Sequence, residues 1–230
     1  MATDAARRDD LSRCPVLMPI SARLPALLLA LVATTGIAAP AGGTGEARLR
    51  NFLANVQALE GQFHQQVIDS RQQVLEDSSG SVVMQRPGRF RWNYAVPFER
   101  VIVSDGEKVW LYEADLDQVT VRRLSAGIGD TPAALLTGKE AVLDRFKVEK
   151  SWVDGGLALV RLVPRSTDAD FAGVTLGFEG AGLRLLLLED RLGQQTRIDL
   201  SGVRTNPHLA PDAFRFDPPS GADVIDDSEL

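Results

Sequence analysis

The sequence predicts a mainly β domain of antiparallel strands in sequential order, with one helix near its amino-terminal end. Three observations support this fold class. Apolar residues recur at every second position along several segments, which is typical of half-buried strands. Asp-Gly and Gly-rich pairs separate these segments as hairpin turns do, and only one long segment has helical spacing.

An export signal precedes this domain. Arg23 is followed by an apolar stretch of roughly 15 residues, fewer than the roughly 20 that span a bilayer, and then by small residues. We expect cleavage after Ala38 or Ala41. Residues 1–17 carry aspartates that suit neither a signal nor a fold, so Met18 is an alternative start. The predicted parts are an extension and signal peptide at 1–41 and one domain at 42–230.

The composition excludes several classes of protein. Cys14 is the only cysteine and lies before the apolar stretch, so the mature chain has no thiol for a disulfide, a metal site or a lipid anchor. Removing residues 1–41 leaves 21 basic and 28 acidic residues, a net charge of −7. An acidic chain is a poor nucleic-acid binder. These features favour a freely diffusing periplasmic protein.

The helix is predicted over residues 46–60, where Leu49, Phe52, Leu53, Val56 and Leu59 recur at intervals of three and four, and Gly61 ends it. About ten strands follow in meander order. The clearest turns are at 105–106, 154–156 and 180–182.

Alternation stops between residues 125 and 144. Residues 131–136 and 139–143 are predicted as two short helices, with Thr131 as a cap and Pro132 in the first turn. They are too short to form a core alone, so we expect them to lie on the sheet. The proline-rich residues 211–219 and the acidic residues 223–230 are expected to form a frayed end.

No enzymatic motif is present. The two histidines, His64 and His208, are predicted as solvated surface residues, because neither has convergent partners for a metal or a catalytic role. The chain has no G-x-S-x-G, no H-E-x-x-H and no phosphate-binding loop.

The most informative segment is RPGRFRWNY at residues 86–94. Strand parity places Arg86 on the same side as Phe90, Trp92 and Tyr94, unless Pro87 introduces a bulge. A guanidinium facing an apolar interior needs acceptors, and the carbonyls of residues 131–136 would supply them if that segment is a lid. The alternative is that Arg86 turns outward and pairs with an acid. The aromatic residues fit either a filled core or a cavity wall.

At these residues the chain resembles the outer-membrane lipoprotein carrier family, LolA. The likeness extends in order and spacing over nearly all of the mature chain. Its matching segments are GQFHQ at 61–65, residues 86–94, VSDG at 103–106, VWLY at 109–112, LDQVT at 116–120, DTP at 130–132 with Leu135 and Leu136, and FRFDPP at 214–219 with Gly221.

The resemblance implies an incompletely closed antiparallel β-barrel, or half-barrel, with an N-terminal helix and a short helical lid over a hydrophobic cavity. The cavity would hold the acyl chains of lipoproteins released by an inner-membrane ABC transporter, for delivery to an outer-membrane receptor. Arg86 would be the lid latch, Thr131 and Pro132 would begin the lid, and Phe90 would help to retain cargo. The expected wall consists of Phe63, Met84, Phe90, Trp92, Tyr94, Val101, Val103, Trp110, Tyr112, Leu135 and Leu136.

Further expectations follow from this likeness: a monomer in the periplasm, with no catalytic activity, no cofactor and no metal. The alternative function is that of a LolA-like periplasmic lipid-binding or lipoprotein-sensing regulatory protein. Such regulators usually carry a second domain, for which this chain has no room. A lipid hydrolase would need a nucleophile and a base that the sequence does not show.

Overall fold

The computed structural model describes residues 44–124, 136–138, 140–167, 169 and 171–228. All of them belong to one compact unit, residues 40–230. The predicted signal at 1–41, and Thr131, Pro132 and Leu135 of the predicted lid, lie outside the described residues. None of the helices in the described part combines the length and hydropathy that crossing a bilayer requires.

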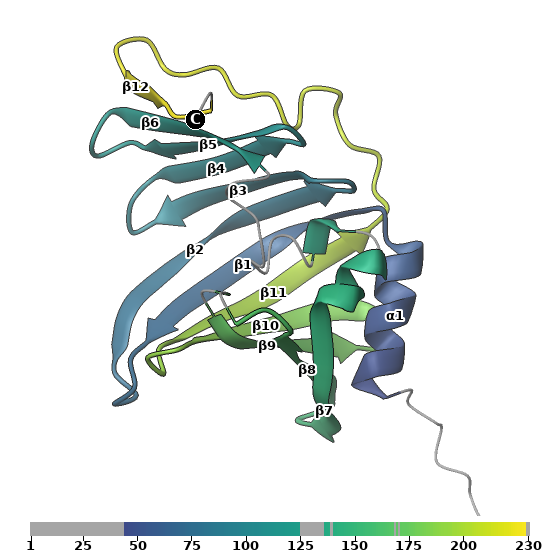
Figure 1. The fold of residues 1–230 in the computed structure, drawn as a ribbon. Helices are drawn as coiled ribbons and strands as arrows, with labels where there is room; N and C mark the ends of the chain where they lie inside the picture. Colours follow the sequence, from purple (N-terminus) through teal and green to yellow (C-terminus); the bar gives the residue numbers. More distant parts are fainter. Residues whose placement is uncertain (1–43, 125–135, 139, 168, 170, 229–230) are drawn as a thin grey trace, which may run out of the picture. The chain divides into compact units, whose positions relative to one another are not determined.

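The described unit is one open sheet of twelve strands with a helix on it (Figure 1). The elements are α1 (Gly45–Asn55), β1 (Ala58–Ile68), β2 (Val74–Gln85), β3 (Arg89–Val96), β4 (Arg100–Asp105), β5 (Lys108–Glu113), β6 (Gln118–Arg123), the 3-10 helix η1 (Glu140–Arg145), β7 (Phe146–Asp154), β8 (Leu157–Pro164), β9 (Phe171–Glu179), β10 (Gly182–Asp190), β11 (Gln195–Thr205) and β12 (Asp223–Asp226).

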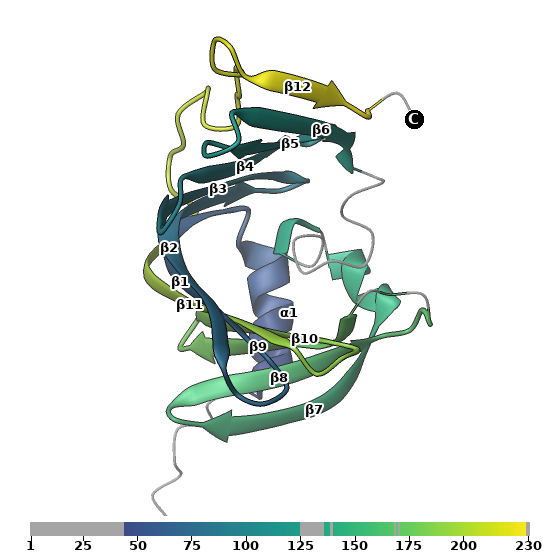
Figure 2. The same ribbon diagram turned by 90° about the vertical axis from the view of Figure 1, so that its left-hand side faces the viewer.

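The sheet consists of two antiparallel meanders, β1 to β6 and β7 to β11, and the edge strand β12. The strand order is β12-β6-β5-β4-β3-β2-β1-β11-β10-β9-β8-β7. The meanders join where β1 pairs with β11, for example at Phe63 opposite Leu200. The outer strands β12 and β7 do not pair with each other, so the sheet is an incomplete barrel. Figure 2 shows its curvature, with α1 on the concave side. The predicted half-barrel is confirmed.

The helix is shorter than predicted. It is capped by the Thr44 side chain and ends at Asn55, with Val56 in an extended conformation. Residues 58–68 form β1, so Leu59 and Gly61 are strand residues. Gly61 suits the sheet because a side chain there would come within 3.1 Å of the Ser201 carbonyl oxygen on β11. Tertiary pairing overrides the helical spacing of this short stretch.

The three predicted hairpin turns are confirmed. Residues 105–106 connect β4 to β5, residues 154–156 connect β7 to β8, and residues 180–182 connect β9 to β10. The predicted helix at 139–143 corresponds to η1. The expectation of a frayed carboxyl end is wrong at residues 223–226, because these form β12 and pair in parallel with β6.

Candidate functional site: an apolar concave face closed by a helix

The concave face of the sheet is apolar and its centre is aromatic. The Phe63 ring packs edge-on against Trp92 at 4.8 Å and against Tyr94 at 4.9 Å between ring centroids. Met84 lies opposite Phe90 in the β2–β3 pairing, and both side chains are buried. The predicted wall residues on β1, β2 and β3 therefore share one face, together with the buried Leu136.

Helix α1 lies on this face over β7, β8 and β9. Its buried residues Leu49, Phe52 and Leu53 belong to the same core cluster as Val160 and Leu176. The helix approaches the sheet closely at its first turn, where a side chain at Gly45 would come within 2.1 Å of the Leu159 carbonyl oxygen. The glycine thus allows α1 to rest directly on the backbone of β8.

The empty space beside the aromatic residues is small. A cavity of about 10 Å³ is lined by Met84, Phe90, Trp92, Leu136 and their neighbours. A space of this size holds at most about one water molecule. The concave face is therefore packed at this place, and an apolar ligand enters there only if neighbouring groups such as Leu136 move away.

Arg86 follows β2 and is 5 % exposed. Its Nη1 donates hydrogen bonds to the carbonyl oxygens of Phe52 at 3.3 Å and Leu53 at 3.4 Å, and also to that of Val56. The guanidinium carbon lies 5.1 Å from the centre of the Phe52 ring. Arg86 thus points inward and binds the carboxyl end of α1, so the alternative of an outward arginine paired with an acid is wrong.

Burial of the Arg86 guanidinium carries a desolvation cost. Desolvation lowers its pKa to about 10, so the guanidinium remains charged at neutral pH. Nε and Nη2 are buried and have no hydrogen-bond partner within the described part of the chain. The charge is offset by carbonyl oxygens at the end of α1: those of Leu53 and Val56, and that of Phe52, which also accepts from the Val56 amide.

The predicted contact between Arg86 and residues 131–136 is not tested by these bonds, because residues 131–135 lie outside the described part. Leu136 and Thr137 are described and buried, at 7 % and 4 % exposure. The carbonyl oxygen of Thr137 accepts a hydrogen bond from the Gly88 amide at 3.3 Å. This end of the segment therefore lies beside the loop that carries Arg86.

Four residues predicted for the cavity wall lie on the other face of the sheet. Val103 and Val101 pair with Arg91 and Asn93, whose side chains point away from Phe90 and Trp92. Trp110 and Tyr112 pair with these valines and share their side. The assignment of Val101, Val103, Trp110 and Tyr112 to the cavity is therefore corrected: strand parity places them on the convex face.

A second apolar cluster covers that convex face. It contains the buried residues Val101, Val103, Val119, Val121 and Phe214. The segment after β11 reaches it: the Tyr112 and Phe216 rings are 6.1 Å apart, and Arg91 Nη1 donates to the Arg215 carbonyl oxygen at 3.1 Å. The FRFDPP segment thus packs on the outside of β3–β5.

Several concave residues were not predicted for the site, among them Leu59, Val82, Leu183 and Leu200, which line the small cavity. Val82, Leu183 and Leu200 lie on predicted strands, whereas the sequence places Leu59 in the predicted helix; only the pairing of the strands shows that all four face the aromatic residues. Gln65, which lies on a predicted strand, is buried and accepts a hydrogen bond from the Tyr94 hydroxyl at 3.1 Å. Burial is the main cause that raises the pKa of Tyr94.

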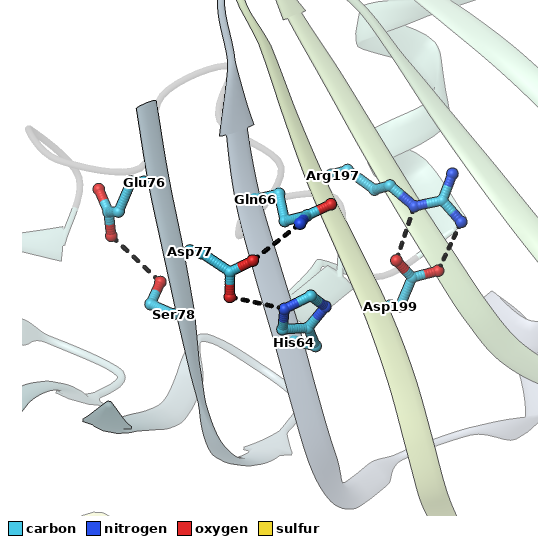
Figure 3. A network of polar contacts seen from close by, with 7 residues as sticks. All are labelled: His64, Gln66, Glu76, Asp77, Ser78, Arg197 and Asp199. Atoms are coloured by element: carbon cyan, nitrogen blue, oxygen red, sulfur yellow. Dashed lines mark hydrogen bonds and ion pairs between the residues drawn. The ribbon is translucent and has the colours of Figure 1, made fainter. Parts of the chain in front are cut away.

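His64 lies on the convex side of β1, as its parity predicts (Figure 3). Its Nε2 is 2.7 Å from Asp77 Oδ1, and Gln66 donates to Asp77 Oδ2 at 2.8 Å. Beside them on β11, Arg197 pairs with Asp199 at 2.6 Å. The hydrogen bonds from Gln66 and His64 lower the pKa of Asp77. No group of three metal-ligating side chains occurs among the residues with assigned positions.

These features define the class of the protein: an open antiparallel half-barrel whose apolar concave face is covered by a helix that a buried arginine caps. The chain belongs to the outer membrane lipoprotein carrier protein LolA family, whose model matches residues 54–217.

Curated relatives match most of the chain. An outer-membrane lipoprotein carrier protein of Methylococcus capsulatus is 42 % identical over 192 residues, which cover 84 % of this chain and 92 % of the relative. One of Nitrosospira multiformis is 41 % identical, over 79 % of this chain and 88 % of the relative. A solved LolA superfamily protein of Nitrosomonas europaea has a TM-score of 0.45 at 10 % identity, with 76 % of this chain and 98 % of that one covered.

Proposed function

We propose that this protein carries acylated lipoproteins through the periplasm, holding their acyl chains between α1 and the concave face of the sheet. The observation that carries the proposal is the continuous apolar cluster on the concave face, which extends from β1, β2 and β3 to the strands under α1, the helix whose end is held by Arg86. Relatives about 40 % identical are named outer-membrane lipoprotein carrier proteins.

Carriage requires binding that is reversible. Each buried methylene is worth about 0.8 kcal/mol, so three acyl chains in a preformed cavity would be released very slowly. Here the cavity of about 10 Å³ must first be enlarged. Separating α1 from β7–β9, or Leu136 from the aromatic residues, costs packing energy. This cost reduces the net affinity for acyl chains and lets a partner with a better-matched site take the cargo.

Transfer needs no covalent chemistry in this scheme, so the protein acts as a monomeric carrier and not as an enzyme. An inner-membrane ABC transporter would load it and an outer-membrane lipoprotein receptor would unload it. Arg86 would hold the closed state, and Phe90, in the wall of the small cavity, would contact the acyl chains.

Purification of the mature protein from periplasm, followed by mass spectrometry of bound acylated species, tests the proposal. We expect intact triacylated lipoproteins. An apolar fluorescent dye should bind the same interior and be displaced by a triacylated lipopeptide. Recovery of a membrane regulator without acylated cargo would favour the sensing alternative, and a dye that stays in water would contradict the interior site.

Arg86→Leu tests the role of the closed state. The variant should still accept lipoprotein but should transfer it poorly to the receptor, because the open form is no longer penalised. Arg184→Leu is a suitable control, since Arg184 forms only a surface ion pair with Glu179 at 3.3 Å. Equal transfer by wild type, Arg86→Leu and Arg184→Leu would show that Arg86 has no role in transfer.

A further inference from the structure

A second, larger pocket lies at the ends of β2 to β5. Its volume is about 400 Å³, and Leu75, Tyr94, Phe98, Arg100 and Glu113 are among the residues that line it. We call it the β2–β5 pocket. The predicted cavity wall includes only Tyr94 of this set.

Large apolar side chains are exposed at the β2–β5 pocket. Phe98 is 67 % exposed and Leu75 is 60 % exposed, and both line the pocket. Val74 and Val96, adjacent in sequence to lining residues, are 53 % and 55 % exposed. Apolar residues that gather on a surface with a polar rim are typical of an interaction site.

The charge of this rim is strongly negative. Glu76, Asp77, Glu99, Glu113 and Asp115 line the pocket, and Arg100 is its single cationic residue. The acids at positions 99, 113 and 115 form no ion pair within the part of the chain that has been placed. The pocket therefore offers unneutralised negative charge next to exposed apolar surface.

The one cation is already engaged. The Arg100 guanidinium carbon lies 4.2 Å from the centre of the Tyr94 ring, and its Nη2 is 3.5 Å from Glu76 Oε1. Tyr94 in turn packs on Phe63 and donates to Gln65. Tyr94 and Arg100 thus lie between the β2–β5 pocket and the apolar interior, and we expect substitutions at Phe98 or Glu99 to leave the interior unchanged.

We infer that the β2–β5 pocket docks a partner protein through a segment that carries an apolar side chain flanked by Lys or Arg. The apolar side chain would pack between Leu75 and Phe98, and the cations would face Glu99 and Glu113. Charge complementarity of this kind speeds encounter and rejects acidic partners. The inference goes beyond the proposed function, since it gives the carrier a recognition surface apart from its cargo.

Site-specific photocrosslinking of the full chain in cells that produce it tests the inference. Phe98→p-benzoylphenylalanine places the probe in the pocket. Leu192→p-benzoylphenylalanine is the matched control, because Leu192 is 86 % exposed in the β10–β11 turn and does not line the pocket. Mass spectrometry identifies the crosslinked peptide. We expect an adduct at position 98 alone, on a protein segment with Lys or Arg beside an apolar residue.

The double variant Glu99→Gln/Glu113→Gln, combined with the probe at 98, should reduce the adduct at least about fivefold, because rim charges mainly govern association. Its affinity for the apolar dye should be unchanged. Equal adducts at 98 and 192, an acidic peptide, a lipid adduct, no adduct at all, or no effect of the double variant would each overturn the inference. Loss of dye binding by the double variant would contradict the claim that the β2–β5 pocket is separate from the apolar interior. Lipoprotein carriage is tested independently, by mass spectrometry of the lipoproteins bound to the purified protein.

Discussion

Arg86 supplies a positive charge that the last turn of α1 lacks. The last turn of the helix contains no basic residue, although a positive charge there would offset the partial negative charge of the helix end. The guanidinium from the β2–β3 loop supplies that charge from 30 or more residues away in sequence. Arg86 thus ties the end of the helix to the sheet, together with Asn206, whose Nδ2 donates to the Asn55 carbonyl oxygen at 2.9 Å.

Arg86→Leu should lower the free energy of unfolding by about 1–3 kcal/mol, because it leaves carbonyl oxygens at the end of α1 without a donor in a buried position. Urea unfolding monitored by tryptophan fluorescence measures the change. Arg86→Lys keeps the charge but not the planar fork, and should recover part of the loss. If Arg86→Leu and wild type unfold at the same urea concentration, the hydrogen bonds contribute nothing to stability.

Asp77 should make the stability depend on pH. Its pKa in the folded protein lies below the ordinary value of 3.8, so the ionised form stabilises the fold above that pH and the stabilisation is lost as the pH falls through the lower value. Asp77→Asn should therefore be less stable than wild type at pH 5 and above, and should converge with it in strong acid.

Urea unfolding at a series of pH values down to about 2.5 measures that difference. Asp212→Asn, at an exposed aspartate outside the sheet, is the control and should track wild type at every pH. A constant difference between Asp77→Asn and wild type over the whole range would contradict the assignment.

At the scale of elements, the hairpins could be predicted from sequence because their turns are local, whereas face assignments needed the register. β4 and β5 read Val-Ile-Val and Val-Trp-Leu-Tyr, with apolar residues on both faces. Alternation therefore could not distinguish the concave Ile102 from the convex Val101 and Val103. Only pairing with β3, where Arg91 and Asn93 mark the convex side, determines the orientation.

Contacts between residues far apart in the sequence could not be predicted either. Leu59 fits a helix and a strand equally well, and its pairing with Met84 on β2 and Thr205 on β11 decides for the strand. Strand parity leaves both orientations of Arg86 open; the inward one, which the resemblance to the LolA family favours, is the one that its hydrogen bonds to α1 show. Its acceptors on α1 could not be predicted, because they depend on where the helix lies on the sheet.

Gly45→Ala tests the contact between α1 and β8. The new methyl group would meet the Leu159 carbonyl oxygen at 2.1 Å and the Val160 nitrogen at 2.8 Å, both of them backbone atoms that cannot turn aside. We expect a loss of about 1–3 kcal/mol from overpacking, measured by thermal unfolding. Gly182→Ala is the control, since its methyl group would meet nothing closer than 3.5 Å. Equal melting temperatures for the two variants would show that α1 is free to shift.

At the scale of the whole described unit, the sheet has apolar clusters on both faces. The concave cluster is covered by α1, and the convex cluster is covered by the segment between β11 and β12. Arg89 stacks over the Phe214 ring at 5.6 Å, so cationic side chains of β3 help to hold this segment. The concave face is thus available for the proposed cargo, whereas the apolar cluster on the convex face contributes to the stability of the fold.

Phe214→Ala should destabilise the protein by about 3–5 kcal/mol, as is usual for a buried phenylalanine, without lowering the affinity of the interior for the apolar dye. Calorimetry and dye titration below the melting temperature separate the two effects. Phe98→Ala, at a position 67 % exposed, is the control and should leave stability nearly unchanged. Loss of dye affinity in Phe214→Ala at a temperature where it is folded would show that the two faces are coupled.

The pairing of β1 with β11 has a consequence for the order in which the molecule is made. The central strand of the sheet has only β2 as a neighbour until residues 195–205 are present, so the earlier meander can form while its apolar side still lacks the second half of the sheet. Contacts so distant in sequence form slowly. A chain that emerges from its amino-terminal end therefore exposes apolar strand surface until β11 has been synthesised. It needs protection from aggregation during that time.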